Sequence, residues 1–95
     1  MIEVNEYFNG KVKSFTVNSD EGRQTVGVMQ KGEYEFNTDA AEVMTVISGM
    51  ISVYLPKYDE WEDFEKGASF DAPAKSVLKV RVECDSAYLC EYIME

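Results

Sequence analysis

The chain is a succession of short β-rich runs separated by turn residues, and no segment keeps a helical period over three turns. The strands predicted in this way cover residues 11–17, 25–29, 33–36, 44–47, 51–55, 61–64, 69–72, 77–84 and 87–93. Many short strands at close, regular spacing are typical of a sandwich or a barrel. We therefore expect an all-β fold, closed into a barrel that removes exposed strand edges.

Two connections read as hairpins. Residues 44–47 and 51–55 flank a turn that contains Gly49, and Pro56 is expected to end the second strand. The runs 77–84 and 87–93 flank the dipeptide Asp-Ser at 85–86. Pairing of these last two runs predicts one aromatic, charged face, made of Lys79, Arg81, Glu83, Tyr88, Cys90 and Tyr92. That face is either solvated or a pocket lining with stacking rings and cations, and a register error of one residue would invert it.

Length and charge limit the protein further. A chain of 95 residues, 45% of them hydrophobic, predicts one domain spanning 1–95 with a single core. It carries 9 basic and 18 acidic residues, a net charge of −9. Such a chain repels nucleic acids and anionic membranes, so neither is expected as a partner. The acidic N-terminus lacks the apolar stretch of a signal peptide, which predicts a cytoplasmic protein with reduced thiols.

The chain contains no histidine. This excludes Ser-His-Asp and Cys-His catalysis, histidine zinc sites and the two-histidine iron site. We therefore expect no metal. Acid–base chemistry, if the protein performs any, must use Glu, Asp, Lys, Tyr or Cys.

Two spacings are similar to those of the cupin fold. Glu42 is followed by six residues and Gly49, and Gly67 by five residues and Pro73. Cupins normally place two histidines before that glutamate and one after that proline, and these are absent here. The spacing agrees with an all-β jelly-roll barrel that has lost its metal.

A second resemblance covers nearly the whole chain. Its blocks are NEYF at 5–8, GKVKS at 10–14, VGVM at 26–29, GEY at 32–34, MTVISG at 44–49 and YLC at 88–90. They resemble the small bacterial pyrimidine/purine nucleoside phosphorylase family. The resemblance implies a metal-free, homodimeric cupin without a cofactor. Its implied reaction converts a purine or pyrimidine nucleoside and inorganic phosphate, as co-substrate, into free base and α-D-ribose 1-phosphate.

Three positions depart from that pattern. Ala74 stands where glycine is expected, Lys75 where histidine is expected, and Arg81 where an uncharged polar residue is expected. We expect these three departures to affect details of the pocket rim more than the assignment to the family.

Phosphorolysis of an N-glycosidic bond needs a cation for phosphate, a group to position ribose, and a stacked base whose leaving nitrogen is protonated. Arg23, beside Gly22, is our first choice for phosphate, because arginine can grip it with two parallel hydrogen bonds. Lys13 and Arg81 are secondary choices. The alternative for all three is a solvated surface cation.

Glu42 is the second expected catalytic residue, because a carboxyl group buried in a barrel could bind ribose hydroxyls or act as an acid. The alternative is an ordinary loop glutamate. Possible stacking platforms for the substrate are Tyr7, Phe8, Tyr34, Tyr88 and Tyr92. Each of these rings could instead belong to the core or to an interface.

Two further side chains have structural interpretations. Without a histidine partner, Cys90 is expected to be a buried structural thiol. Trp61, in an acidic segment, is expected at a dimer contact, with a ligand lid as the alternative. Two other functions stay open: a metal-free cupin that binds a small sugar- or nucleotide-like ligand without turnover, and an interaction protein whose aromatic patches serve other proteins.

Overall fold

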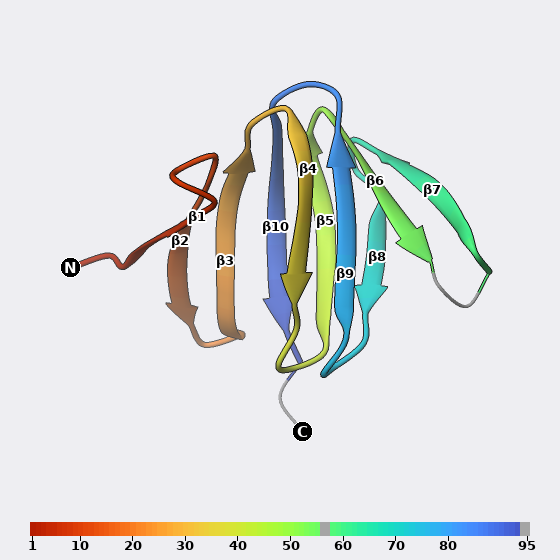
Figure 1. The fold of residues 1–95 in the computed structure, drawn as a ribbon. Helices are drawn as coiled ribbons and strands as arrows, with labels where there is room; N and C mark the ends of the chain where they lie inside the picture. The colour runs from red at the N-terminus through yellow and green to blue at the C-terminus, as the bar shows by residue number, and fades with distance from the viewer. Residues whose placement is uncertain (56–57, 94–95) are drawn as a thin grey trace.

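Two facing antiparallel sheets make up the part of the chain that the computed structural model describes, residues 1–55 and 58–93 (Figure 1). The strands are β1 (Val4–Tyr7), β2 (Val12–Ser19), β3 (Gly22–Met29), β4 (Gly32–Asn37), β5 (Glu42–Ser48), β6 (Met50–Leu55), β7 (Glu60–Glu65), β8 (Ser69–Ala72), β9 (Val77–Val82) and β10 (Ser86–Tyr92). Sheet A has the order β1-β2-β3-β10-β5-β8, and sheet B the order β4-β9-β6-β7. The all-β prediction is confirmed. Pro56 lies outside the described residues.

The strands follow the alternation of side chains along the chain. In β2, Val12, Ser14 and Thr16 are buried while their neighbours are exposed. β9 repeats the pattern with Leu78 and Val80. One face of each strand therefore meets the other sheet, and the core between the sheets is formed by apolar side chains such as Val12, Met29, Val46, Ile51, Val53 and Val80. β1 is a strand that the sequence analysis did not predict.

The expected barrel is not closed. No strand of sheet A pairs with a strand of sheet B in the described residues, so the architecture is a two-sheet sandwich. The edges that closure would have removed are protected in other ways. β1 and β8 have only four residues each, and β7 carries the four acidic residues Glu60, Glu62, Asp63 and Glu65. Short and charged edge strands resist pairing with other chains.

Both predicted hairpins are wrong, because each connection crosses between the sheets. β5 and β10 belong to sheet A, while β6 and β9 belong to sheet B. Gly49 turns the first corner with φ of +84°, and a Cβ there would lie 2.3 Å from Ser86 Oγ on the second corner. The Met50 amide donates to that hydroxyl at 3.2 Å. The two corners are therefore packed together, at a tightness that only glycine permits.

This arrangement also corrects the predicted aromatic, charged face. β10 pairs with β3 and β5, and its inward positions are Tyr88, Cys90 and Tyr92. β9 instead pairs with β4 and β6. The tyrosines therefore face the interior, while Lys79 and Arg81 lie on the outer face of sheet B.

Candidate functional site

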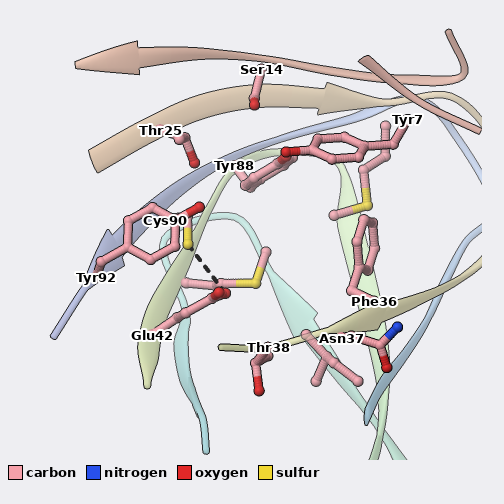
Figure 2. Close-up of a pocket in the computed structure, with 13 residues that line it drawn as sticks. Tyr7, Ser14, Thr25, Phe36, Asn37, Thr38, Glu42, Tyr88, Cys90 and Tyr92 are labelled. Atoms are coloured by element: carbon pink, nitrogen blue, oxygen red, sulfur yellow. Dashed lines mark hydrogen bonds between the residues drawn. The ribbon is translucent and has the colours of Figure 1, made fainter. Parts of the chain in front are cut away.

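A cavity of about 130 Å³ lies between the two sheets. Figure 2 shows side chains from both sheets pointing into it. Its lining residues are Tyr7, Ser14, Thr25, Met29, Phe36, Asn37, Thr38, Glu42, Met44, Leu78, Tyr88, Cys90 and Tyr92. Hydroxyl, amide and carboxyl groups therefore share the space with apolar walls. No lysine or arginine lines it among the described residues.

Three strands of sheet A place Arg23, Tyr92 and Glu42 in one cross-strand row on the inner face. Tyr92 is the register partner of Glu42, and the preceding pair, Glu91 with Gln24, brings Arg23 to the other side of Tyr92. The Arg23 guanidinium carbon lies 5.1 Å from the centre of the Tyr92 ring. Since neighbouring strands are about 4.8 Å apart, Arg23 and Glu42 start about 10 Å from one another. Arg23 is exposed, so it stands at the rim.

Glu42 is hydrogen-bonded inside the cavity. The Cys90 thiol donates to Glu42 Oε1 over 3.3 Å (Figure 2). Burial raises the pKa of the Glu42 carboxyl, and the bond from Cys90 partly lowers it again. Burial, followed by the nearby Glu42 charge, raises the pKa of the Cys90 thiol to about 12. The thiol therefore stays protonated and donates its hydrogen to the Glu42 carboxyl.

Tyr88 covers the floor of the cavity and is only 6% exposed. Its ring lies against Gly27, where an added Cβ would come within 2.6 Å of Tyr88 Cζ. Burial raises the Tyr88 pKa far above its ordinary value, and a hydrogen bond from Ser14 opposes this shift. Asn5 in turn donates to Ser14 Oγ at 3.3 Å and to Thr16 Oγ1 at 3.1 Å. A polar network therefore runs from β1 to the cavity.

The turn after β1 connects two strands of sheet A and places an aromatic ring against sheet B. Phe8, Asn9 and Gly10 have positive φ angles of 54°, 58° and 86°. This turn leaves Tyr7 at the cavity and directs the Phe8 ring to sheet B, where it lies 5.0 Å from Tyr34 and 5.4 Å from Phe36. Phe8 and Tyr34 thus pack beside the cavity and do not line it.

The predicted cations are separated by the fold. Arg23 stands at the cavity rim. Lys13 is exposed on sheet A and lies 3.8 Å from Glu6 in an ion pair. Arg81 lies on the outer face of sheet B, where its guanidinium carbon is 4.3 Å from the centre of the Trp61 ring.

Of the predicted site residues, the cavity brings together Glu42, Tyr7, Tyr88 and Tyr92, with Arg23 next to Tyr92. Sequence reasoning missed Ser14, Thr25, Asn37 and Thr38 as lining residues. For Ser14 and Thr25 a signal was present, since each lies two or four residues from a buried apolar residue of its own strand, Val12 on β2 and Met29 on β3. Thr38 had none, because its place depends on bonds to distant residues. Its hydroxyl donates to the Pro73 carbonyl at 2.6 Å and accepts from the Ser76 amide at 2.9 Å.

The described part of the chain holds neither a metal-binding cluster nor a membrane-spanning helix. Between residues 1–55 and 58–93, no three Cys, Asp or Glu side chains come together in a way that could hold a metal ion. The same residues contain no helix long and apolar enough to cross a membrane. The cavity offers a carboxyl group with a raised pKa, hydroxyl groups and aromatic surface, with a cation at its rim. This set suits a neutral polar ring compound bound next to a small anion.

Comparison with known proteins relates the chain to one family and one fold. The family model for pyrimidine/purine nucleoside phosphorylase matches residues 2–92. The chain is 53% identical over 92 residues to a pyrimidine/purine nucleoside phosphorylase of Pseudomonas putida, covering 97% of this chain and 98% of that one. It is similar to a Vibrio parahaemolyticus protein of unknown function, with a TM-score of 0.93 and 41% identity over 98% of this chain and 99% of that one. The cupin-like EutQ protein of Clostridium difficile, 13% identical with a TM-score of 0.71 over 83% of this chain and 64% of that one, shares the fold alone.

Proposed function

The chain belongs to the pyrimidine/purine nucleoside phosphorylase family, and from this we propose that it cleaves purine and pyrimidine nucleosides with inorganic phosphate. The products are the free base and α-D-ribose 1-phosphate. The observation that carries the proposal is the row Arg23–Tyr92–Glu42, which sets a cation and a half-buried carboxyl on either side of an aromatic ring.

The nucleobase occupies the cavity in this proposal. Met29, Met44 and Leu78 offer apolar contact to its faces, and the aromatic side chains offer stacking. Every base has two π-faces, so a site that relies on stacking accepts purines and pyrimidines alike. Hydroxyl groups such as those of Ser14 and Thr25 satisfy polar edges without demanding one particular base.

Phosphate binds at the rim, beside Arg23. A guanidinium group can hold two phosphate oxygens at once. At the rim, phosphate also avoids the desolvation cost of entering a cavity that no lysine or arginine of the described residues lines. The span of about 10 Å between the strands of Arg23 and Glu42 leaves room for a ribose ring between phosphate and acid.

Glu42 is the general acid of the proposed step. A phosphate oxygen forms a bond to the anomeric carbon while the bond from that carbon to the base nitrogen breaks. The neutral Glu42 carboxyl gives its proton to the leaving nitrogen and becomes a carboxylate. The proton brought by hydrogen phosphate restores the acid, so charge and atoms balance. Burial favours the neutral form that this role requires.

A homodimer in the cytoplasm completes the proposal. It is supported by an exposed apolar row on the outer face of sheet A, where Phe15, Val26 and Leu89 are cross-strand neighbours. Phe15 is 50% exposed and Val28, in the next row, 52%. A second copy covering this face would bury it. The mass in solution, measured by light scattering for the wild type and Val28→Lys, tests this part alone.

Base release tests the activity. Purified protein is incubated with uridine or adenosine, with and without phosphate, and the products are separated by chromatography. Free base that forms only with phosphate is the expected result. Release without phosphate would mean a hydrolase. Ligand-induced stabilisation without any release would replace the enzyme with a binding module, and no stabilisation by any nucleoside would favour a protein-interaction role.

A further inference from the structure

Cys90 is the one cysteine of the chain that lies in the cavity, while Cys84 is exposed. It sits in the middle of β10, opposite Thr25 of β3 and Met44 of β5. Its thiol is directed diagonally to Glu42, two residues before Met44, and donates to Oε1 at 3.3 Å. Figure 2 shows this bond crossing the gap between the two strands.

We propose that Cys90 is the positioning residue of the site: its thiol holds one carboxyl oxygen of Glu42 and leaves the other to face the bound nucleoside. This inference rests on the proposed function for the role of Glu42, but the contact itself does not. Cys90 touches no reacting atom in this view and acts only through Glu42.

The surroundings of Glu42 make the thiol its main fixed partner. Tyr92 flanks the carboxyl on β10, and Arg23 of β3 lies beyond that ring. β8 contributes Ala72, its register partner, which does not titrate. The last residue of β4, Asn37, and the next residue, Thr38, also line the cavity, and these do not titrate either. The titratable and charged groups that bear on Glu42 are thus Cys90, Tyr92 and Arg23.

The thiol has a different effect on each form of Glu42. When Glu42 is neutral, the thiol donates a weak hydrogen bond to the carbonyl oxygen, and this bond fixes the plane of the carboxyl group. Once the proton has moved to the leaving base nitrogen, the same donor faces a carboxylate, and hydrogen bonds to charged acceptors are stronger. Burial therefore favours the protonated form of Glu42 before the reaction. The hydrogen bond from Cys90 favours loss of that proton during the reaction.

Three variants test this role: Cys90→Ala removes the donor, Cys90→Ser keeps a hydroxyl donor, and Cys84→Ala is the matched control at the exposed cysteine. The side-chain carboxyl of Glu42 is titrated by ¹³C NMR without any substrate, and Glu42→Gln assigns its signal. We expect the Glu42 pKa to be higher in Cys90→Ala than in the wild type, since an ionised form has lost its donor. Cys90→Ser should bring the pKa back down, and Cys84→Ala should leave it unchanged.

Kinetics provide the second readout. We expect kcat to fall about five-fold in Cys90→Ala, a loss typical of one weak hydrogen bond, with KM for phosphate unchanged. The alkaline limb of the pH–rate profile should move upward with the Glu42 pKa, and Cys90→Ser should recover most of kcat.

The two failures can be told apart. An unchanged Glu42 titration in Cys90→Ala overturns the role of Cys90, whatever the activity. A shifted titration in a protein that cleaves no nucleoside upholds the pairing of Cys90 with Glu42 and overturns the proposed reaction. If Cys90→Ala does not fold, Cys90→Val, which fills the space of the thiol but has no donor, replaces it: an unchanged Glu42 pKa in Cys90→Val overturns the proposal.

Discussion

The protein places an arginine over an aromatic ring in two regions, and the two pairs have different surroundings. On the outer face of sheet B, Arg81 lies 4.3 Å from the Trp61 ring, and Lys79 lies 5.7 Å from that of Tyr54. At the cavity, Arg23 lies 5.1 Å from the Tyr92 ring. The closer pair is the one farther from the site, so contact strength alone does not identify function.

What distinguishes the cavity is the second sheet. Sheet B covers the inner face of sheet A, and burial there raises the pKa of Glu42 and of Tyr92, the latter to about 12. The outer face of sheet B has no such cover, and Trp61 is 37% exposed. Its carboxylates and cations stay in water, where their interactions are weak. The comparison indicates that desolvation, and not residue type, separates the cavity from the outer face of sheet B.

The largest expected effect comes from removing the half-buried carboxyl of Glu42. Glu42→Gln should lower kcat for nucleoside phosphorolysis by about 100- to 1,000-fold, within the range for loss of a general acid. Glu33→Gln is the matched control, because Glu33 is exposed on β4 and pairs with Arg81 in the register of sheet B. Steady-state rates for both variants check the prediction. Equal losses of kcat in the two variants would contradict a special role for the cavity.

The two arginines provide a second test of the difference between the cavity and the outer face of sheet B. Arg23→Ala should raise the KM for phosphate about 10- to 50-fold, since a charge-assisted hydrogen bond contributes about 1.5–3 kcal/mol. Arg81→Ala should change it less than about two-fold and cost about 0.5–1 kcal/mol of stability, as expected for an exposed cation–π pair. Phosphate titrations at saturating uridine, with urea unfolding of each variant, provide the test. A larger kinetic loss in Arg81→Ala would move the phosphate site to sheet B.

Gly27 tests the shape of the cavity. A methyl group there would meet the Tyr88 ring at 2.6 Å, so Gly27→Ala should destabilise the protein by about 1–3 kcal/mol through overpacking. Tyr88→Phe in the same background should not relieve this loss, because Cε1 of the ring is also within 2.8 Å. Tyr88→Leu, which lacks the planar ring, should relieve part of it. Urea unfolding measures all of these variants.

The smallest effect concerns pH and stability. The raised pKa means that folded Glu42 holds its proton more tightly than the unfolded chain does. Its contribution to stability is therefore present below the ordinary pKa of 4.5 and is lost as the pH rises through the folded value. Glu42→Gln should gain stability relative to the wild type as the pH rises from 4 to 8. Calorimetry of both proteins over this range checks the sign, and a constant difference in Tm would contradict it.

The sequence predicted those parts of the fold that depend on neighbouring residues. β-rich runs between turn residues located nine strands, and side-chain alternation placed Leu78 and Val80 on one face of β9, because the period of two is local. It failed at Gly49 and Ser86, where a turn signal is the same for a hairpin and for a corner between sheets. The difference lies in packing between the two corners, and no local pattern encodes that contact.

The site divided in the same way. Glu42 was found through its motif spacing, and Tyr88 and Tyr92 through alternation. The pairing of Cys90 with Glu42 was not predicted, since it depends on β10 lying next to β5. The assumed β9–β10 hairpin placed Tyr88, Cys90 and Tyr92 opposite the wrong partners. One error in strand pairing thus misplaced Arg81 and hid the bond at the centre of the cavity.

The position of β10 in sheet A has a consequence for how the protein folds. β2 and β3 form a local hairpin and can pair early, but β10 inserts between β3 and β5 only after a long loop has closed. Until then β3 and β5 each expose an unpaired edge, and the cavity lacks Tyr88, Cys90 and Tyr92. Assembly of the site and completion of the sheet are therefore one kinetic event. Any partly folded form without β10 would lack the candidate site and, with two open edges, would be prone to aggregation.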